Sequence, residues 1–441
     1  MTISLPKQDD CEVVRLGECR YRSPAEARGF PFLDDRDRVL LSPDLTVLRP
    51  YLDANESPPT FESAGPRRRI FFQPDGLTCG IVTCGGLCPG LNDVIRSIVM
   101  TLYYVYGVRR IIGFRYGYAG LSGKPVEPPL MLAPDSVDRI HDDGGTLLGS
   151  SRGEQPVVEM VDTLVNWDVS ILFTIGGDGT QRGAHQIAGE IRKRNMPISV
   201  IGIPKTIDND LQWIDRSFGF LTAVEESRPA VLAAHAEAKG VHNGVGLVKL
   251  MGRHSGFIAL NVSLANPDVN FCLVPEVPFP LSGDGGFLEA LADRLRRRRH
   301  AVIVVAEGAG QELLQDSGQT EKDESGNVKL KDVGVFLKNE IARYCAGIGL
   351  DAGIKYIDPS YTIRSQPANS NDSAYCLILG QNAVHAGMAG RTDMVVGFTN
   401  GHFTHLPIPL VTGSRKQIDP RGEAWQYLLQ MTGQPSWKAA Q

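Results

Sequence analysis

Two turns rich in glycine and aspartate, each directly after a strand-like run, constrain this chain more than any other feature. The apolar run 169–175 stops abruptly at Gly176-Gly-Asp-Gly-Thr180, which predicts a buried strand and a tight turn. Residues 181–194 have helical spacing, and a second strand-like run, 197–203, ends in Pro204-Lys-Thr-Ile-Asp-Asn-Asp210. Ligands bind at the carboxyl ends of parallel strands, so this order predicts a doubly wound α/β sheet with both turns facing one site.

These turns carry the residue types that metal-assisted phosphoryl transfer needs. Glycines at a helix N-terminus let backbone N–H groups approach a polyphosphate closely. Asp178 repels phosphate, so we expect it to hold a magnesium ion that the phosphates share. Thr206, Asp208 and Asp210 are expected close to Asp178. If their loop stays extended, Asp208 and Asp210 point to one side, where one accepts a hydroxyl proton and the other tunes it or reaches the metal.

Two further glycine-rich segments lie upstream. Residues 80–92 have the strand, turn and helix order of a nucleotide-binding unit, with the helix continuing through 93–99. They lack the Gly-x-Gly-x-x-Gly spacing, so no dinucleotide site is indicated. The loop 144–153 offers hydroxyls and Arg152, which suits a phosphate clamp, although an isolated loop arginine is more often a solvated charge.

Together these motifs resemble those of the phosphofructokinase family. The family's order is kept by Thr83-Cys-Gly-Gly86, the 144–152 loop, the two turns described above, Met251-Gly-Arg-His-Ser-Gly256 and Val274-Pro-Glu276. The resemblance runs from about Cys79 to about His405. Pro204-Lys205 and the segment 355–364 look like the branch that contains pyrophosphate-dependent enzymes and their ATP-using relatives.

The resemblance implies a role for each matching residue. Asp208 matches the general base that takes the proton from the 1-hydroxyl of fructose 6-phosphate, Asp178 matches the Mg²⁺ site, and Arg253 could stabilise charge on the transferred group. Thr206 and Asp210 complete the implied catalytic set. Nucleotide contacts are implied for Gly85, Arg152, Gly153, Gly177, Asp178, Gly179 and Thr180. Substrate contacts are implied for Thr206, Asp208, Met251, Gly252, Arg253, Glu276, Tyr361 and Arg364, with Glu276 suited to sugar hydroxyls and Arg364 to the 6-phosphate.

Two residues bear on the phosphoryl donor. Pyrophosphate users of the family carry a second aspartate where this chain has Gly179, and glycine leaves room for the α-phosphate of a nucleotide. Lys205 points the other way, since it resembles the lysine that neutralises phosphate in pyrophosphate users. The combination favours ATP, with a pyrophosphate-dependent enzyme as the alternative and an NAD or lipid kinase as a more distant one. A catalytically dead subunit is disfavoured because both Asp178 and Asp208 are present.

One departure concerns charge on the sugar-phosphate side. The family's ATP enzymes carry an arginine shortly before Met-Gly-Arg, contributed across a subunit interface, and residues 242–249 contain none. Either Lys249 or another basic residue supplies the charge, or the interface differs.

By the same resemblance the chain divides into two doubly wound, Rossmann-like domains with the active site in the cleft between them. Residues 1–76 form an N-terminal extension, expected to pack on the body or on a neighbour. The nucleotide-binding domain is 77–219 with a return at 367–400, and the sugar-phosphate domain is 220–366 with the tail 401–441. The polar insertion 315–327 is expected to be a surface loop.

Composition narrows partners and location. The net charge of −5 gives no footprint for nucleic acid, and the basic run 294–300 is expected to be the solvated end of a helix before the strand 301–306. The eight cysteines are scattered and are interpreted as packing residues, Cys84 and Cys88 included. No signal segment and no membrane-length apolar run are present. We therefore expect a cytoplasmic protein. The family resemblance implies a homo-oligomer, a dimer or tetramer, whose partners are ATP and fructose 6-phosphate.

Overall fold

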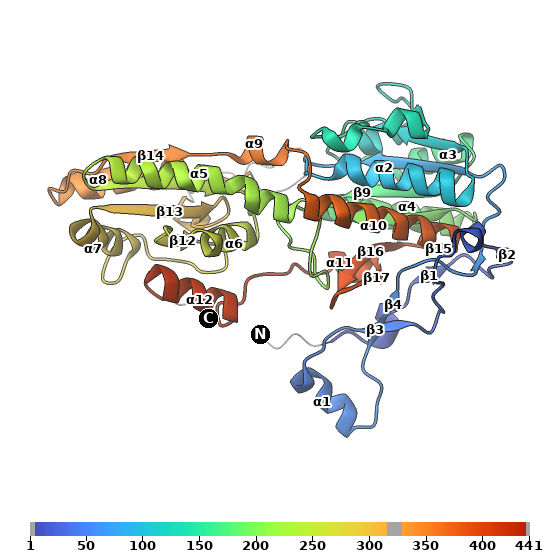
Figure 1. Cartoon of the computed structure of the whole chain (residues 1–441), viewed down its shortest axis with the longest axis horizontal. Helices are drawn as coiled ribbons and strands as arrows, with labels where there is room; N and C mark the ends of the chain where they lie inside the picture. The colour runs from blue at the N-terminus through green and yellow to red at the C-terminus, as the bar shows by residue number, and fades with distance from the viewer. Residues whose placement is uncertain (1–4, 315–328, 438–441) are drawn as a thin grey trace.

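The computed structural model describes residues 5–314 and 329–437, which form two α/β domains side by side along the long axis of the molecule (Figure 1). The fold class predicted from the sequence is confirmed. The polar insertion 315–327, predicted as a surface loop, lies outside the described residues.

The first domain is built on a nine-stranded sheet. Its strands, in spatial order, are β3 (Arg38–Leu40), β4 (Thr60–Ser63), β17 (His402–Pro407), β16 (Met394–Thr399), β10 (Ser199–Pro204), β9 (Val169–Gly176), β6 (Thr78–Thr83), β7 (Arg110–Phe114) and β8 (Leu130–Leu132). The run from β16 to β7 is parallel, and the outer pairs are antiparallel. The central strands β6 and β10 are buried along their whole length, as expected for parallel strands covered on both faces.

Helices cover both faces of this sheet. Because successive strand residues point to opposite faces, β9 places Ile171 against α2 (Leu91–Thr101) and α10 (Ser370–Met388). Its neighbour Leu172 faces α3 (Val157–Asn166), α4 (Asp178–Lys193) and α11 (Ile408–Thr412). The predicted strands are present, and α4 begins three residues before the predicted helix start.

The second domain contains a parallel four-stranded sheet in the order β12 (Phe271–Leu273), β13 (His300–Ala306), β11 (Gly244–Leu250) and β14 (Ile354–Ile357). Its helices are α5 (Phe220–Gly240), α6 (Phe257–Ala265), α7 (Phe287–Arg298), α8 (Val333–Gly347), α9 (Ser360–Arg364) and α12 (Glu423–Thr432). The basic run ends α7 and leads directly into β13, as the sequence predicted.

The N-terminal extension packs on the body of the same chain. Besides β3 and β4 in the large sheet, β1 (Val14–Arg15) pairs with β15 (Arg391–Thr392), and β2 (Tyr21–Arg22) pairs with β5 (Arg69–Ile70). The helix α1 (Leu45–Asp53) lies at the periphery (Figure 1). Buried Glu62 accepts hydrogen bonds from Arg67 at 2.9 Å and from Arg391 at 2.6 Å, which ties the extension to the domain behind it.

Three segments of the described chain cross between the domains: 205–219, 365–369 and 413–422 (Figure 1). The tail therefore divides, because β17 and α11 belong to the first domain and only α12 packs on the second, against α6. This placement differs from the predicted grouping of 401–441 with the second domain. Antiparallel pairing with β16 across the two-residue turn Asn400-Gly401 decides it. Asn-Gly between two strand-like runs is a hairpin signal, and it is one that we missed.

The two cysteines of the 80–92 segment lie in environments that suit packing, as expected. Cys84 and Cys88 are buried, and burial raises the pKa of both thiols, to about 12 for Cys84. This environment suits packing rather than reactivity. Within residues 5–314 and 329–437, no helix has the length and apolarity to cross a membrane.

Candidate active site

Three parallel strands deliver the predicted turns to one edge of the sheet. In the order β10, β9, β6, Pro204 is level with Gly176, and Thr83 is level with Ile175. Backbone hydrogen bonds continue past the strand ends, since the N–H of Lys205 donates to Gly176 at 3.0 Å. A Cβ added at Gly176 would lie 2.2 Å from the Thr180 hydroxyl oxygen, so only glycine fits the turn. The sequence thus placed both turns correctly relative to each other.

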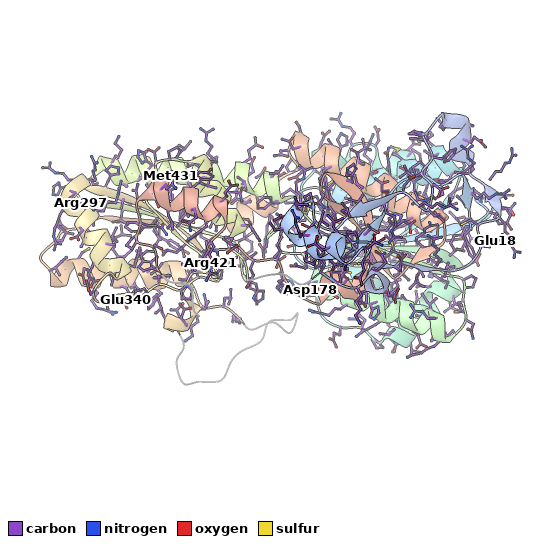
Figure 2. The ribbon with its side chains drawn as sticks, turned by 90° about the horizontal axis from the view of Figure 1, so that it is seen from below. Glu18, Asp178, Arg297, Glu340, Arg421 and Met431 are labelled. Carbon is purple, nitrogen blue, oxygen red and sulfur yellow. The ribbon has the colours of Figure 1, made fainter. Side chains whose placement is uncertain are left out.

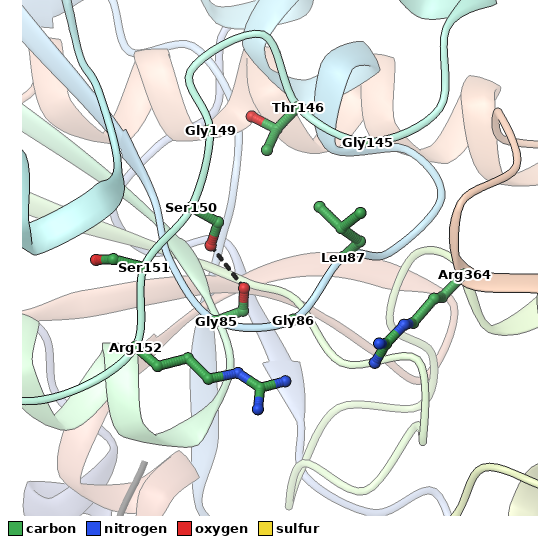
Figure 3. A pocket seen from close by; sticks show the side chains of 10 residues that line it. All are labelled: Gly85, Gly86, Leu87, Gly145, Thr146, Gly149, Ser150, Ser151, Arg152 and Arg364. Atoms are coloured by element: carbon green, nitrogen blue, oxygen red, sulfur yellow. Dashed lines mark hydrogen bonds between the residues drawn. The ribbon is translucent and has the colours of Figure 1, made fainter. Parts of the chain in front are cut away.

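The glycine turn after β6, Gly85-Gly86, is called the first turn, and it lines an open pocket of about 660 Å³ (Figure 3). Gly85 has a φ of +84°, its N–H donates to Ser151 at 3.0 Å, and its carbonyl accepts from the Ser150 hydroxyl at 2.6 Å. Figure 3 shows Arg152 and Arg364 reaching in from opposite sides. The pocket is lined by Gly85, Gly86, Leu87, Gly145, Thr146, Gly149, Ser150, Ser151, Arg152 and Arg364. Glycines, hydroxyls and two guanidinium groups make it suitable for phosphate.

Lys205 lies beneath this turn rather than in the open pocket. Only 6% of it is exposed, and its ammonium donates to the carbonyl of Gly86. Burial lowers the pKa of Lys205, and the positive charges of Arg152 and Arg364 act in the same direction. The lysine therefore joins the first turn to the end of β10 and adds positive charge to the pocket floor.

The turn at the end of β9, residues 176–180, is called the second turn. It leads into α4 and places Asp178 on the side of the first domain that faces the second domain (Figure 2). Its carboxylate pairs with Arg182 at 2.7 Å and with Arg415 at 3.1 Å. Thr180 is buried, and its carbonyl accepts a hydrogen bond from the Tyr118 hydroxyl at 2.6 Å. A Cβ at Gly179 would meet nothing within 4 Å, which leaves open space beside Asp178.

The segment after β10, residues 205–210, is called the base loop because it carries the predicted base Asp208. It folds into a compact turn and is not the extended loop that we assumed. Asn209 has a φ of +56°, and its side-chain oxygen accepts from the N–H of Ser217 at 2.9 Å. Thr206 donates to Asp210 at 2.9 Å. Arg415 contacts both Asp210 and Asp178, so the predicted closeness of these two carboxylates is confirmed.

Asp208 is a carboxylate whose Oδ1 is buried and has no hydrogen-bond partner among the residues that the structure describes. Burial and the negative charges of Asp210 and Glu307 raise the pKa of Asp208 to about 8, and a backbone hydrogen bond from Arg253 opposes the rise. An unpaired buried oxygen is costly unless a ligand satisfies it.

The second domain contributes the Met251-Gly-Arg253 turn after β11. Met251 is buried in the core of that domain, and Gly252, with a φ of +131°, accepts a backbone hydrogen bond from Gly308 at 3.0 Å. Beside this turn Glu307 follows β13. Burial raises the pKa of Glu307, and the positive charges of Arg253, Lys249 and Arg364 counter the rise.

Glu276, predicted to bind sugar hydroxyls, is already engaged. Its two carboxylate oxygens accept from the N–H of Gly256 at 3.0 and 3.1 Å, and one also accepts from Ile418 at 3.0 Å. Glu307 lies electrostatically close to Asp208 instead. The sequence offered a signal that we missed, because Glu307 directly follows a strand-like run, the position that identified Asp178.

Two basic residues of the second domain are also placed by their contacts. Lys249 pairs with Asp332 at 3.0 Å and Asp358 at 2.9 Å, so its charge is held within the domain. Tyr361 is 75% exposed, and the Arg364 guanidinium stacks 4.3 Å from its ring. Arg364 also lines the pocket of the first turn, whereas Tyr361 lies at the surface.

A metal ion would find carboxylates here but no complete cage. The described residues contain no cluster of three or more His, Cys, Asp and Glu side chains arranged to hold one. Mg²⁺ is commonly bound through one or two carboxylates plus substrate phosphates and water. Asp178 beside a phosphate pocket fits that donor set, and Arg415 already supplies positive charge at this point.

Glycine turns lie at the carboxyl edge of a parallel sheet, and an aspartate beside them has a buried Oδ1 without a partner among the described residues. Together with a second α/β domain, these features define a phosphotransferase. The chain belongs to the phosphofructokinase family, whose model matches residues 78–387. This membership sets aside the NAD and lipid kinase alternative.

Relatives cover the chain almost completely. The chain is 47% identical to the ATP-dependent 6-phosphofructokinase of Borreliella burgdorferi over 438 residues, which cover 97% of each protein. It is 48% identical to the ATP-dependent 6-phosphofructokinase of Amycolatopsis methanolica, over 99% of this chain and 96% of that relative. Among solved structures, the pyrophosphate-dependent phosphofructokinase of Marinobacter aquaeolei matches with a TM-score of 0.65, covering 81% of this chain and 91% of that one. At 20% identity this last likeness concerns the fold alone.

Proposed function

We propose that this protein is an ATP-dependent 6-phosphofructokinase, which transfers the terminal phosphoryl group of ATP to the 1-hydroxyl of fructose 6-phosphate in glycolysis. The proposal rests on relatives of that name along nearly the whole chain and on one structural observation. That observation is the buried Oδ1 of Asp208, which lacks a partner among the described residues. A substrate hydroxyl would satisfy it.

The residues around Asp208 divide the chemistry. Asp208 accepts the proton of the 1-hydroxyl as the oxygen attacks phosphorus, and a loose transition state needs that transfer only late. Thr206 holds Asp210 in place by a hydrogen bond. Arg253 stabilises negative charge on the transferred group. Its positive charge also opposes the rise in the pKa of Glu307. Burial of this cluster keeps water away from the reacting oxygen.

The donor side uses the first two glycine turns. Gly153 binds phosphate through its backbone N–H and Arg152 through its guanidinium, while Gly85, whose N–H donates to Ser151, lets the phosphates approach the backbone closely. Gly177, Gly179 and Thr180 bind phosphate through backbone N–H groups at the start of α4. Asp178 would hold Mg²⁺, with the donor phosphates as further ligands. When bound, the ion neutralises charge on the phosphoryl group and orients it.

On the acceptor side, Thr206, Met251, Gly252 and Arg253 contact the sugar phosphate. Glu276 accepts three hydrogen bonds from backbone N–H groups and keeps room on Oε2 for a sugar hydroxyl, and Glu307 is a second carboxylate for the sugar hydroxyls. Arg364 and Tyr361 bind the 6-phosphate. Since Arg364 stands at the donor pocket, this role requires its rotation toward the sugar phosphate.

The donor assignment rests on the open space at Gly179. A nucleotide α-phosphate can occupy that space, whereas pyrophosphate does not need it. Pyrophosphate stays the alternative because of Lys205, whose buried ammonium adds charge under the phosphate pocket. Ribose and base contacts would add affinity for ATP that pyrophosphate cannot gain.

The test is turnover of purified protein with fructose 6-phosphate and Mg²⁺, with ATP and pyrophosphate compared. We expect fructose 1,6-bisphosphate with ATP, and turnover with pyrophosphate alone would reverse the donor assignment. Asp208→Asn should lower kcat by about two orders of magnitude or more, the range usual for a lost base. Equilibrium binding of fructose 6-phosphate to this variant should stay near that of the unaltered enzyme, and near-normal turnover would refute the base.

Two further parts of the proposal concern the cell and the assembly. We place the enzyme in the cytoplasm, where glycolytic substrates are found. We also propose a homo-oligomer, a dimer or tetramer, in which a neighbouring subunit supplies the missing positive charge, because Lys249 is held by Asp332 and Asp358. Light scattering of the purified protein measures the assembly.

A further inference from the structure

The segment that joins α11 to α12, residues 413–422, crosses between the domains through the functional site, and we call it the tail crossing (Figure 1). It forms neither helix nor regular strand, apart from an isolated bridge between Arg415 and Leu211. Its side chains and N–H groups nevertheless contact Asp178 on the donor side, Asp210 in the base loop and Glu276 on the acceptor side. A connection of this kind is more than a spacer between two domains.

Arg415 spans two strand ends with a single guanidinium. One of its terminal nitrogens lies 2.8 Å from Asp210 Oδ2, and the other lies 3.1 Å from Asp178 Oδ2. The side chain of Asp210 is 5% exposed and that of Asp178 is 16% exposed. Carboxylates so withdrawn from water need a counter-charge. The rigid planar fork of arginine can serve both at once, whereas the single ammonium of lysine cannot do so with the same geometry.

The tail crossing is anchored directly after Arg415, so the guanidinium is held in place. The N–H of Lys416 donates to the Asp210 carbonyl at 2.8 Å, and the Lys416 ammonium donates to the Ile214 carbonyl at 2.7 Å. The N–H of Ile418 then donates to Glu276 at 3.0 Å in the second domain. These bonds fix the position of Arg415 from both domains.

We propose that Arg415 is a positioning residue of the phosphoryl-transfer site, which holds the carboxylates of Asp178 and Asp210 together and competes with the metal ion for them. This inference rests on the proposed function, because it gives Arg415 a part in that reaction. The guanidinium neutralises negative charge that would otherwise attract a divalent cation. It also holds Asp210 opposite Thr206, which donates to the other oxygen of the same carboxylate.

Removal of the guanidinium should therefore have two opposite effects. The carboxylates become free for a cation, so metal binds more tightly to the nucleotide-free enzyme. The carboxylates also lose their fixed spacing and the site loses a positive charge, so turnover slows. A purely structural role for the tail crossing predicts the opposite for metal binding, because a loosened site binds a cation less well.

The experiment uses full-length Arg415→Gln without nucleotide, titrated with Mn²⁺ and followed by water proton relaxation. We expect Mn²⁺ to bind about tenfold more tightly, from the loss of one nearby positive charge. In steady-state assays kcat should fall by about thirtyfold or more. The KM for fructose 6-phosphate should change by less than about threefold, because the ion pairs of Arg415 are with Asp178 and Asp210, neither of which we assign to sugar-phosphate binding.

Arg182→Gln is the matched control. Arg182 also pairs with Asp178 Oδ2, at 2.7 Å, but its side chain is 56% exposed and its recorded ion pair is with Asp178 alone. Both readouts should change by less than about threefold in this variant, since exposed ion pairs are weak. Arg415→Lys keeps the charge without the fork. It should lower kcat with a smaller gain in Mn²⁺ affinity, and it serves as the test if Arg415→Gln does not fold.

Several results would overturn the inference. Unchanged, weaker or undetectable Mn²⁺ binding in Arg415→Gln is one, and full turnover in Arg415→Lys is another. An Arg182→Gln enzyme with the same pair of effects would show that any nearby cation suffices. Failure of the proposed function is distinguishable, because it appears as absent turnover in the unaltered enzyme, while the Mn²⁺ titration needs no substrate.

Discussion

The open space at Gly179 makes the donor preference testable by one substitution. Gly179 lies in the first turn of α4, and an added Cβ would meet nothing within 4 Å. Gly179→Asp therefore introduces a second carboxylate next to Asp178 without steric conflict. A negative charge in the first turn also suits the helix dipole, so the free energy of unfolding should not fall.

The expected loss of activity follows from charge alone. Two unit charges about 6 Å apart repel by about 3 kcal/mol at an effective dielectric constant near 20. Screening at this partly open turn reduces the repulsion, so we expect kcat/KM for ATP to fall by about 30-fold to 100-fold. The magnitude applies to the α-phosphate of ATP, which we propose to lie in the space that Gly179 leaves.

The assay is the initial rate of fructose 1,6-bisphosphate formation as ATP is varied, with chemical denaturation as the stability control. Gly179→Ala adds only a methyl group, and Gly179→Asn adds the same volume as aspartate without its charge. Alanine should keep kcat/KM for ATP within about threefold, and asparagine should lie between alanine and aspartate. Equal losses in Gly179→Ala and Gly179→Asp, or no loss in the aspartate variant, would refute the electrostatic reasoning.

Two other predictions use buried carboxylates. Burial and neighbouring negative charges raise the pKa of Asp208, so the acid limb of the pH profile of kcat/KM should lie near neutral pH. Glu307→Gln removes one of these charges and should move that limb to lower pH. A limb that moves to higher pH or stays fixed contradicts the assignment of Asp208 as the base. Burial opposes the charge of Glu62, but His405 and Arg391 hold its pKa far below the ordinary range, so its stabilisation is full at neutral pH and declines as the pH falls below the unfolded pKa. Glu62→Gln should lower the free energy of unfolding by about 3–5 kcal/mol in urea denaturation, whereas exposed Glu56→Gln should change it by less than about 0.5 kcal/mol; equal effects would show that the buried cluster contributes nothing special.

The sequence was most informative where structure is local. A β-rich run that stops at glycines predicts a strand and a turn, and β9, α4 and β10 have nearly the predicted bounds. Since parallel strands end at one edge, the same reasoning placed Asp178 near Asp210 before any coordinates. It failed for the conformation of the base loop, because the positive φ of Asn209 depends on the hydrogen bond that Ser217 makes from eight residues away.

Long-range contacts lay beyond that reasoning. Glu276 and Glu307 both follow strand-like runs, and only the N–H groups of Gly256 and Ile418 decide that Glu276 is the one already engaged. The composition of the N-terminal extension is typical of a polar arm. Its strands β3 and β4 nevertheless form one edge of the large sheet, and Glu62 of β4 is buried there.

Motifs along the chain were enough to predict the family and, through it, the two-domain α/β fold. The glycine and aspartate turns were predictable because they depend on neighbours along the chain. The tertiary structure alone decided which charges meet. Arg415 lies more than 200 positions after Asp178 and Asp210, in a segment without any motif. It reaches them only because the chain runs through α10, β16, β17 and α11 of the first domain before it crosses to α12. The free energy of an ion pair depends on distance in space, which local sequence does not encode.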